Sequence, residues 1–243
     1  AAWTSAVADV NVGVVLSLTG PAASLGIPNQ KSIQLFPKKI AGQEVHYIFR
    51  DDKSDPTEAV IAAKKLTEDD KVDVLFGPSI TPCGLPVVDV AANAKVPDIT
   101  LSAGANVVSP VDAKRKWVFG VPQTTDMMAS ALVGYMVRNK MTKVAFIGFD
   151  NAYGQEWFSG FTDHGKGVGI EIVANERFAP TSTSVTGQVL HLLAVHPQAV
   201  LIAASGTAAA LPQIALRQLG YKGQIFQTHG VANPDFLRVC GAA

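Results

Sequence analysis

Short apolar segments rich in β-branched residues recur along this chain, and each is followed by a turn and an amphipathic stretch. The segments 10–18, 72–76 and 143–148 are apolar without clean alternation, which is typical of strands covered on both faces. Repeated strand and helix units require right-handed crossovers and a parallel sheet with helices on both faces. The sequence therefore predicts an α/β fold with Rossmann-like parallel sheets flanked by helices.

The alternation of strands and helices occurs in two series. After a short strand at 117–119 the pattern starts afresh with a long amphipathic helix capped by Thr125 or Asp126. Further strands are expected at 143–148, 170–173, 199–204 and 224–227. Two series indicate two lobes, residues 9–120 and 121–243, with a hinge near 119–122.

A helix with a marked beginning follows the second predicted strand. Asp55 is expected as its N-cap, Pro56 as its first residue and Glu58 as the second half of a capping box. Asp51 and Asp52 precede it and resemble a catalytic carboxylate pair. At the end of a strand, however, such residues more often cap and solvate a loop, and this interpretation is preferred.

Composition excludes several classes of function. Lys plus Arg and Asp plus Glu both number 20, so the formal net charge of zero gives no electrostatic reason to bind nucleic acid or an anionic membrane. No apolar run approaches the ~20 residues of a membrane-spanning helix. Cys83 and Cys240 are expected to be free thiols, and the five histidines lack metal-ligand spacing, so neither a metal nor a cofactor is predicted.

The first eight residues contain a pattern associated with export. Ala6-Val7-Ala8 before Asp9 fits the sequence that precedes a signal-peptide cleavage site. The residues 1–8 are thus the remainder of an export signal, a cloning remnant or an ordinary flexible terminus.

A candidate binding site lies where the predicted strands end. The segments 72–76 and 96–100 are followed by small hydroxyl residues, namely Ser79, Thr81 and Ser102. The carboxyl ends of adjacent parallel strands, together with helix N–H groups, form the usual ligand crevice of an open α/β sheet. Turns of the second series at 149–154, 204–207 and 228–230 would oppose these residues, which predicts a cleft between the lobes.

Several of these motifs occur in register and together resemble one family. They are Val12 to Pro21, Asp51-Asp52 with the helix after them, Phe76-Gly77-Pro78, Phe119 to Asp126, Asp150 to Gly154 and Gly230 to Phe236. In this order they resemble type I periplasmic solute-binding proteins of ABC importers, in the branched-chain amino acid receptor family. The resemblance implies a periplasmic receptor, not an enzyme, whose two lobes close on a solute and present it to an ABC permease in the inner membrane.

The resemblance also implies a set of ligand-binding residues. Those of the first lobe would hold a ligand carboxylate through hydroxyl and backbone N–H groups, and those of the second would enclose the rest of the ligand. The first-lobe set is Ser79, Thr81, Ser102, Ala103 and Gly104, and the second-lobe set is Tyr153, Ser205 and His229. In this comparison Tyr153 is the aromatic residue over the ligand.

His229 departs from the family pattern in a way that bears on the ligand. Amino-acid receptors of this family carry an acidic residue there for the α-ammonium, and an unpaired ammonium in a closed site costs several kcal/mol. His229 therefore favours a carboxylate without an ammonium, such as an aromatic acid, with Ser205 leaving room for a ring. The alternative is that His229 only caps a loop and that the acid comes from elsewhere.

The chain also departs from the family in length, since the relatives continue through a second crossing, further strands of the first lobe and a third crossing. The first lobe is therefore expected to have an incomplete sheet. Three other functions stay open: a receptor for branched-chain or other amino acids, a ligand-sensing regulatory domain with the same fold, and an α/β enzyme. The enzyme is disfavoured because G-x-S-x-G, H-E-x-x-H and phosphate-loop motifs are lacking.

Overall fold

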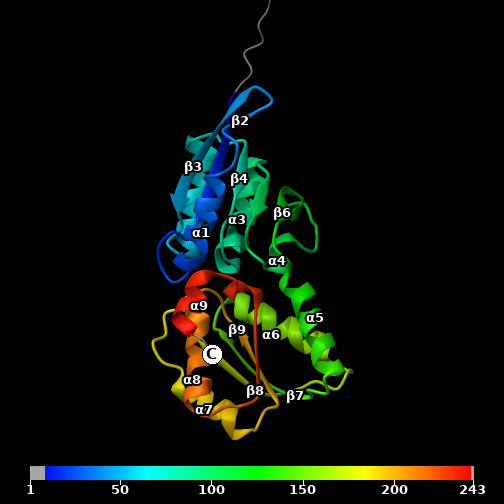
Figure 1. Ribbon diagram of the computed structural model, residues 1–243. Coiled ribbons are helices and arrows are strands. Elements are labelled where there is room, and N and C mark those ends of the chain that lie inside the picture. The colour runs from blue at the N-terminus through cyan, green and yellow to red at the C-terminus, as the bar shows by residue number, and fades with distance from the viewer. Residues whose placement is uncertain (1–8, 242–243) are drawn as a thin grey trace, which may run out of the picture. The chain divides into compact units, whose positions relative to one another are not determined.

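The computed structural model describes residues 9–241, and its chain divides into two compact units (Figure 1). Of the described residues, unit 1 contains 9–20, together with Gly26–Ser102 and Asn106–Pro122. Unit 2 contains Pro21–Leu25, Ala103–Ala105 and residues 123–241. The export pattern at residues 6–8 lies outside the described residues.

The first sheet has the order β2-β3-β1-β4-β5-β6. Its strands pair in parallel except for the short β2, which is antiparallel to β3. The strands are β1 (Val10–Leu16), β2 (Lys39–Ile40), β3 (Gln43–Asp51), β4 (Val74–Phe76), β5 (Asp98–Thr100) and β6 (Val118–Gly120).

Helices pack on both faces of this sheet because β1 buries side chains alternately to either side. Val12 and Val14 pack with Ile33 of α1 on one face, whereas Val15 packs with Ala63 and Val87 on the other. The helical elements are α1 (Ala23–Ile33), α2 (Pro56–Lys64), the π-helical turn η1 (Lys65–Asp69), α3 (Thr81–Ala94), α4 (Ala105–Val108) and the 3₁₀ turn η2 (Arg115–Trp117).

The second sheet has the order β10-β9-β7-β8, and all its strands pair in parallel. Phe146 and Ile147 of β7 are fully buried in one core with Trp157 and Phe161. The strands are β7 (Lys143–Phe149), β8 (Glu171–Phe178), β9 (Ala199–Ala203) and β10 (Gln224–Gln227). The helical elements are α5 (Thr125–Arg138), α6 (Ala152–Gly165), α7 (Thr186–Ala194), η3 (Thr207–Ala209), α8 (Ala210–Gln218), η4 (His229–Val231) and α9 (Pro234–Cys240).

The α/β prediction, with parallel sheets flanked by helices, is confirmed. The periodic pattern located β10 to the residue, but it predicted only 170–173 for the longer β8. Helix α1 begins at Ala23 and contains Pro28. Both thiols are free, as predicted, with Cys83 buried and Cys240 partly buried.

The predicted helix caps are right in one unit and displaced in the other. Asp55 caps α2 by accepting from the N–H groups of Thr57 and Glu58, and Pro56 is the first residue. The reciprocal half of the capping box is absent, because the Asp55 N–H donates to the carbonyl of Asp52 while Glu58 pairs with Lys53 at 3.4 Å.

In the second unit the prediction of Thr125 or Asp126 as the cap of α5 is wrong. Thr124 is the cap, and its hydroxyl accepts from the N–H of Met127. Thr125 is buried, and its hydroxyl is bonded instead to the carboxylate of Glu156.

Candidate functional site

The predicted hydroxyl residues of unit 1 lie at the carboxyl ends of its central strands. Ser79 follows β4, and its Oγ accepts from the N–H of Ser17, just beyond β1, at 3.4 Å. Ser102 follows β5, and its Oγ lies 2.8 Å from that of Thr100. Thr81 begins α3, and its buried hydroxyl has no hydrogen-bond partner among the described residues. These three side chains are therefore at the same edge of one sheet.

At this edge Gly77, just after β4, allows the backbone to pass close to Val15 of β1. Gly77 has φ +104°, and a Cβ there would lie 1.9 Å from the carbonyl oxygen of Val15. A side chain is excluded on both counts. Gly84 on α3 likewise faces Ser102, whose Oγ would be 2.6 Å from an added Cβ. The backbone therefore holds Ser79 and Ser102 close to the first turn of α3.

The segment Ala103–Ala105 packs with unit 2, whereas the predicted first-lobe residues Ser79, Thr81 and Ser102 belong to unit 1. The carbonyl of Ala103 accepts from the N–H of Thr125 at 3.0 Å. The Ala105 N–H donates to the carboxylate of Glu156, which also bonds to the Thr125 hydroxyl. The Ala105 N–H is thus engaged within unit 2, next to the predicted site residues Ala103 and Gly104.

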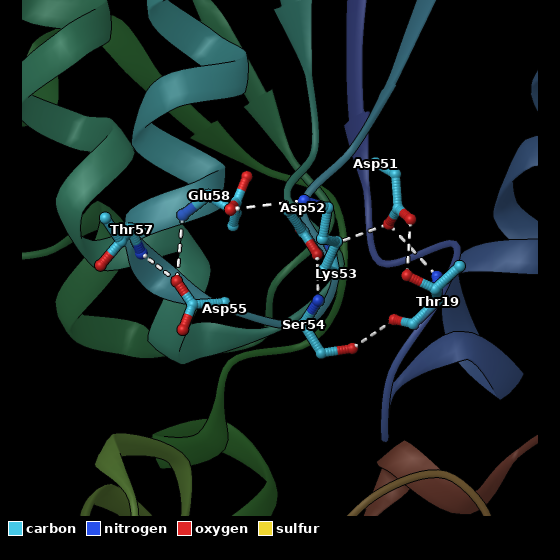
Figure 2. A network of polar contacts seen from close by, with 8 residues as sticks. All are labelled: Thr19, Asp51, Asp52, Lys53, Ser54, Asp55, Thr57 and Glu58. Atoms are coloured by element: carbon cyan, nitrogen blue, oxygen red, sulfur yellow. Dashed lines mark hydrogen bonds and ion pairs between the residues drawn. The ribbon is translucent and has the colours of Figure 1, made fainter.

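Asp51, the last residue of β3, and Asp52 after it bind groups of the neighbouring turns, as the preferred interpretation predicted (Figure 2). Asp51 accepts from the N–H groups of Leu18 and Lys53 at 2.9 and 2.8 Å and from the Thr19 hydroxyl at 2.6 Å. Burial alone would raise the pKa of Asp51, but the hydrogen bonds from Thr19, Lys53 and Leu18 outweigh it and lower that pKa. The ionised carboxylate therefore ties the turn after β1 to the turn after β3.

Asp52 has a different environment from its neighbour. Its side chain is fully buried, and one oxygen accepts from the N–H of Ser54 at 2.8 Å. Burial raises the pKa of Asp52, and the hydrogen bond from the Ser54 N–H opposes this only in part. The Ser54 hydroxyl donates to the carbonyl of Thr19 at 2.8 Å, so it also links the two turns seen in Figure 2.

The aromatic residue predicted over the ligand is buried within unit 2. Tyr153, on the first turn of α6, is 6% exposed, and its hydroxyl donates to the Thr228 hydroxyl at 2.9 Å. Burial raises the pKa of Tyr153 to about 12. The ring of Tyr153 is also 6.4 Å from those of Trp157 and His229 between centroids.

Trp157 was not identified from the sequence. Its ring is fully buried and lies 6.0 Å from the His229 ring. It follows Tyr153 by four residues on α6, and residues at that spacing share one face of a helix, so the spacing could have identified it. Glu156 was missed as well, and its bond to the Ala105 N–H joins residues 51 apart, for which a sequence pattern gives no signal.

His229 begins the η4 turn after β10, and its Nδ1 is buried without a hydrogen-bond partner among the described residues. Burial lowers the pKa of His229, which favours the neutral imidazole. A neutral ring next to two aromatic side chains provides a hydrogen-bonding nitrogen and no counter-charge for an ammonium.

The turns after β9 and β10 are joined to each other. The Thr228 hydroxyl donates to the carbonyl of Ala204 at 2.7 Å, and the Gly206 N–H donates to the carbonyl of Gly230 at 2.8 Å. A Cβ on Gly230 would lie 2.5 Å from that of Ser205. Tyr153, Ser205 and His229 of the predicted second-lobe set are therefore brought together at one edge of the second sheet.

The described part of the chain offers no metal site, and a hollow of unit 1 lies apart from the predicted residues. Residues 9–241 hold no group of three or more His, Cys, Asp or Glu side chains that could bind a metal ion. A hollow of about 670 Å³ in unit 1 lies between α2, η1 and α3, away from the predicted residues. Within the same described range, every helix is too short or too polar to cross a membrane.

Comparison with known proteins places these features in one family. The sequence profile described as "Periplasmic binding protein" matches residues 9–243. The Leu/Ile/Val-binding protein BraC3 of Rhizobium johnstonii is 26% identical over 96% of this chain and 64% of its own. This chain thus spans about two thirds of the length of that relative.

Solved structures show the same partial coverage. An extracellular ligand-binding receptor from Rhodopseudomonas palustris HaA2 is 45% identical with a TM-score of 0.94, over 96% of this chain and 64% of that one. A solute-binding protein of an ABC transporter from Rhodopseudomonas palustris BisB5, in complex with 3,4-dihydroxybenzoic acid, is 23% identical with a TM-score of 0.85, over 96% and 65%. The first supports the family, and the second shows the fold alone.

Proposed function

Because this chain belongs to the periplasmic binding protein family, whose members are receptors and not enzymes, we propose that it captures a small carboxylate outside the cytoplasm for an ABC permease. Aromatic acids are the favoured ligands. Residues of both units are proposed to contact the ligand: hydroxyl and N–H groups after β4 and β5 would bind the carboxylate, and the turns after β9 and β10 would surround the ring.

The observation that carries this proposal is the position of His229, whose ring lies beside those of Tyr153 and Trp157 at the edge of the second sheet. An α-ammonium in a closed site needs an anionic partner. An imidazole ring is either neutral or positively charged, so His229 supplies no negative charge. Glu156, on the same helix as Tyr153, is already bonded to the Thr125 hydroxyl and the Ala105 N–H. The dihydroxybenzoic acid of the Rhodopseudomonas palustris BisB5 protein supplies a suitable class of probe.

Calorimetry on the intact protein tests the ligand class. Benzoate and 4-hydroxybenzoate are expected to bind, and His229→Glu should weaken both about tenfold, since a second carboxylate nearby repels the ligand even with solvent screening. The same substitution should strengthen any binding of leucine or valine by supplying the counter-charge. The control His196→Glu adds the same charge at an exposed position of unit 2. It should change neither the affinity for the aromatic acids nor that for leucine or valine.

A receptor for branched-chain amino acids is the second candidate, because the curated relative is a Leu/Ile/Val-binding protein. It would be favoured if the wild type bound leucine or valine and ignored both aromatic acids. Equal affinities before and after His229→Glu for every ligand would exclude His229 from the binding site. A sensing role would be favoured if the protein bound the acid but did not support its ATP-dependent uptake with the permease.

Ligand contact with both units is proposed to favour a closed state, with bending near residues 119–122. The last of the chain's passages between the units, from Pro122 to Gln123, supports this position. Small-angle scattering of the intact protein should then change on saturation with the acid. Identical profiles with and without saturating ligand would contradict the closure.

A further inference from the structure

We propose that Tyr153 is a positioning residue that acts through Thr228: the two hydroxyls fix the turns after β9 and β10 and hold His229 against Trp157. The inference rests on the proposed function for its consequence on ligand binding, but its geometric part concerns unit 2 alone. It differs from the role expected from the sequence, in which the Tyr153 ring covers the ligand directly.

The first step is a chain of buried hydrogen bonds that joins three separate turns. The Tyr153 hydroxyl, from the start of α6, donates to Thr228 Oγ1 at 2.9 Å. Thr228 Oγ1 in turn donates to the carbonyl oxygen of Ala204 at 2.7 Å. Thr228 is 1% exposed, so water does not replace these bonds when one partner is removed. Each hydroxyl therefore has one fixed direction of donation.

The second step is that the two turns cannot shift independently. The Gly206 N–H donates to the carbonyl of Gly230 at 2.8 Å. A Cβ on Gly230 would be 2.5 Å from Ser205 Cβ and 3.4 Å from the Tyr153 hydroxyl. There is thus no room for a side chain at position 230 beside Ser205. A displacement at Thr228 is transmitted to Ser205 on one side and to His229 on the other.

The third step concerns the position of His229. Its ring is flanked by Trp157 at 6.0 Å and Tyr153 at 6.4 Å between centroids. Among the described residues, no hydrogen bond holds its buried Nδ1. The orientation of the imidazole is therefore determined by the aromatic contacts and by the backbone of the turn, which Thr228 fixes one residue earlier.

Two substitutions interrupt the chain of bonds at different atoms. Tyr153→Phe removes one buried oxygen at nearly constant volume, and Thr228→Val removes both the acceptor and the donor. Thr228→Ser retains the hydroxyl and is the rescue. Tyr135→Phe is the matched control, since Tyr135 is a half-exposed tyrosine of α5 whose ring packs on Phe226 in the same unit.

The first readout requires no ligand. Ring signals of His229, assigned by NMR in the intact protein, should move in Tyr153→Phe and in Thr228→Val, return towards the wild type in Thr228→Ser and stay in place in Tyr135→Phe. Unmoved His229 signals in both folded variants would overturn the proposal. If Thr228→Val does not fold, Tyr153→Phe decides the question alone.

The second readout is the affinity for 4-hydroxybenzoate. Each single variant should bind it about tenfold more weakly, and the double variant Tyr153→Phe/Thr228→Val should be no weaker than either single one, because both interrupt the same chain of bonds. Loss in Tyr153→Phe with full affinity in Thr228→Val would show direct contact by Tyr153 and overturn the proposal. If the wild type binds no aromatic acid, the proposed function fails, while the NMR result still decides the positioning role.

Discussion

In unit 1 the turn after β1 is tied to the turn after β3 by the charged carboxylate of Asp51, whereas in unit 2 the turn after β9 is tied to the turn after β10 by the uncharged hydroxyl of Thr228. The contrast extends to the cores. Among the described residues, the buried carboxyl groups Asp52 and Asp98 are both in unit 1, while the buried polar side chains of unit 2 are neutral. The stability of unit 1 should therefore depend on pH more strongly than that of unit 2.

The two units nevertheless share one backbone feature. In each, a glycine near the start of a helix packs against the end of the preceding strand. A Cβ on Gly26 would be 2.0 Å from the carbonyl oxygen of Ser17, and one on Gly154 would be 2.0 Å from that of Phe149. The close approach is thus common to both units, and the chemistry that ties the turns together is what differs.

The largest expected effect tests this shared feature. Gly26→Ala and Gly154→Ala should each lower the free energy of unfolding of their own unit by about 3 kcal/mol, because the new methyl group forces helix and strand apart. Hydrogen exchange followed by mass spectrometry distinguishes the units. Gly187→Ala is the control, since nothing lies within 4 Å of its added Cβ, and it should stabilise α7 by up to about 1 kcal/mol. A loss of stability in only one of these two variants would contradict the shared role of the glycines.

The next effect concerns Asp98, whose two carboxylate oxygens are buried without partners among the described residues. Burial raises the pKa of Asp98 well above its ordinary value. The protonated form is thus favoured by folding, so stability is fully present below the unfolded pKa of about 3.9 and is lost as pH rises towards the folded pKa.

Asp98→Asn should therefore stabilise unit 1 at pH 7 by at least about 1 kcal/mol, with little difference near pH 3. Denaturant unfolding at several pH values measures this difference. The control is Asp89→Asn, at a surface carboxylate that pairs with Lys114, which should have an effect near zero. A gap between Asp98→Asn and the wild type that narrows as pH rises would contradict the buried unpaired carboxyl.

The contribution of Asp51 to the stability of unit 1 should depend on pH in the opposite direction to that of Asp98. Hydrogen bonds from Thr19, Lys53 and Leu18 lower the pKa of Asp51 against the effect of burial. Its contribution is therefore present above the unfolded pKa of about 3.9 and is lost as pH falls towards the folded pKa.

Asp51→Asn should cost unit 1 about 1 kcal/mol at pH 7, allowing for solvent screening, and almost nothing at pH 2. Hydrogen exchange of the turns after β1 and β3 provides the measurement. Equal acid sensitivity in the turns after β9 and β10 would contradict the contrast between the units.

How far the sequence anticipated these results depends on the distance over which each interaction acts. Strands such as β10 and the cap at Asp55 were identified because hydrophobic periodicity and capping depend on neighbouring residues. The sequence could not show that Thr124, and not Thr125, caps α5, because the Thr125 hydroxyl is bound by Glu156, 31 residues away. The hydrogen bond of the Tyr153 hydroxyl likewise joins it to Thr228, 75 residues away.

The smallest expected effect compares the two helix caps. Asp55 accepts from two N–H groups at 2.8 and 3.0 Å, whereas Thr124 accepts from one at 3.3 Å. An acidic cap also interacts favourably with the positive end of the helix dipole. Asp55→Ala should therefore cost about 1 kcal/mol and Thr124→Ala about 0.5 kcal/mol. Thr124→Ser keeps the accepting oxygen and should restore the protection of the first turn of α5 from hydrogen exchange. A larger loss at Thr124 than at Asp55 would show that charge gives unit 1 no advantage at its helix ends, and would confine the difference between the units to the strand turns and the buried carboxyl groups.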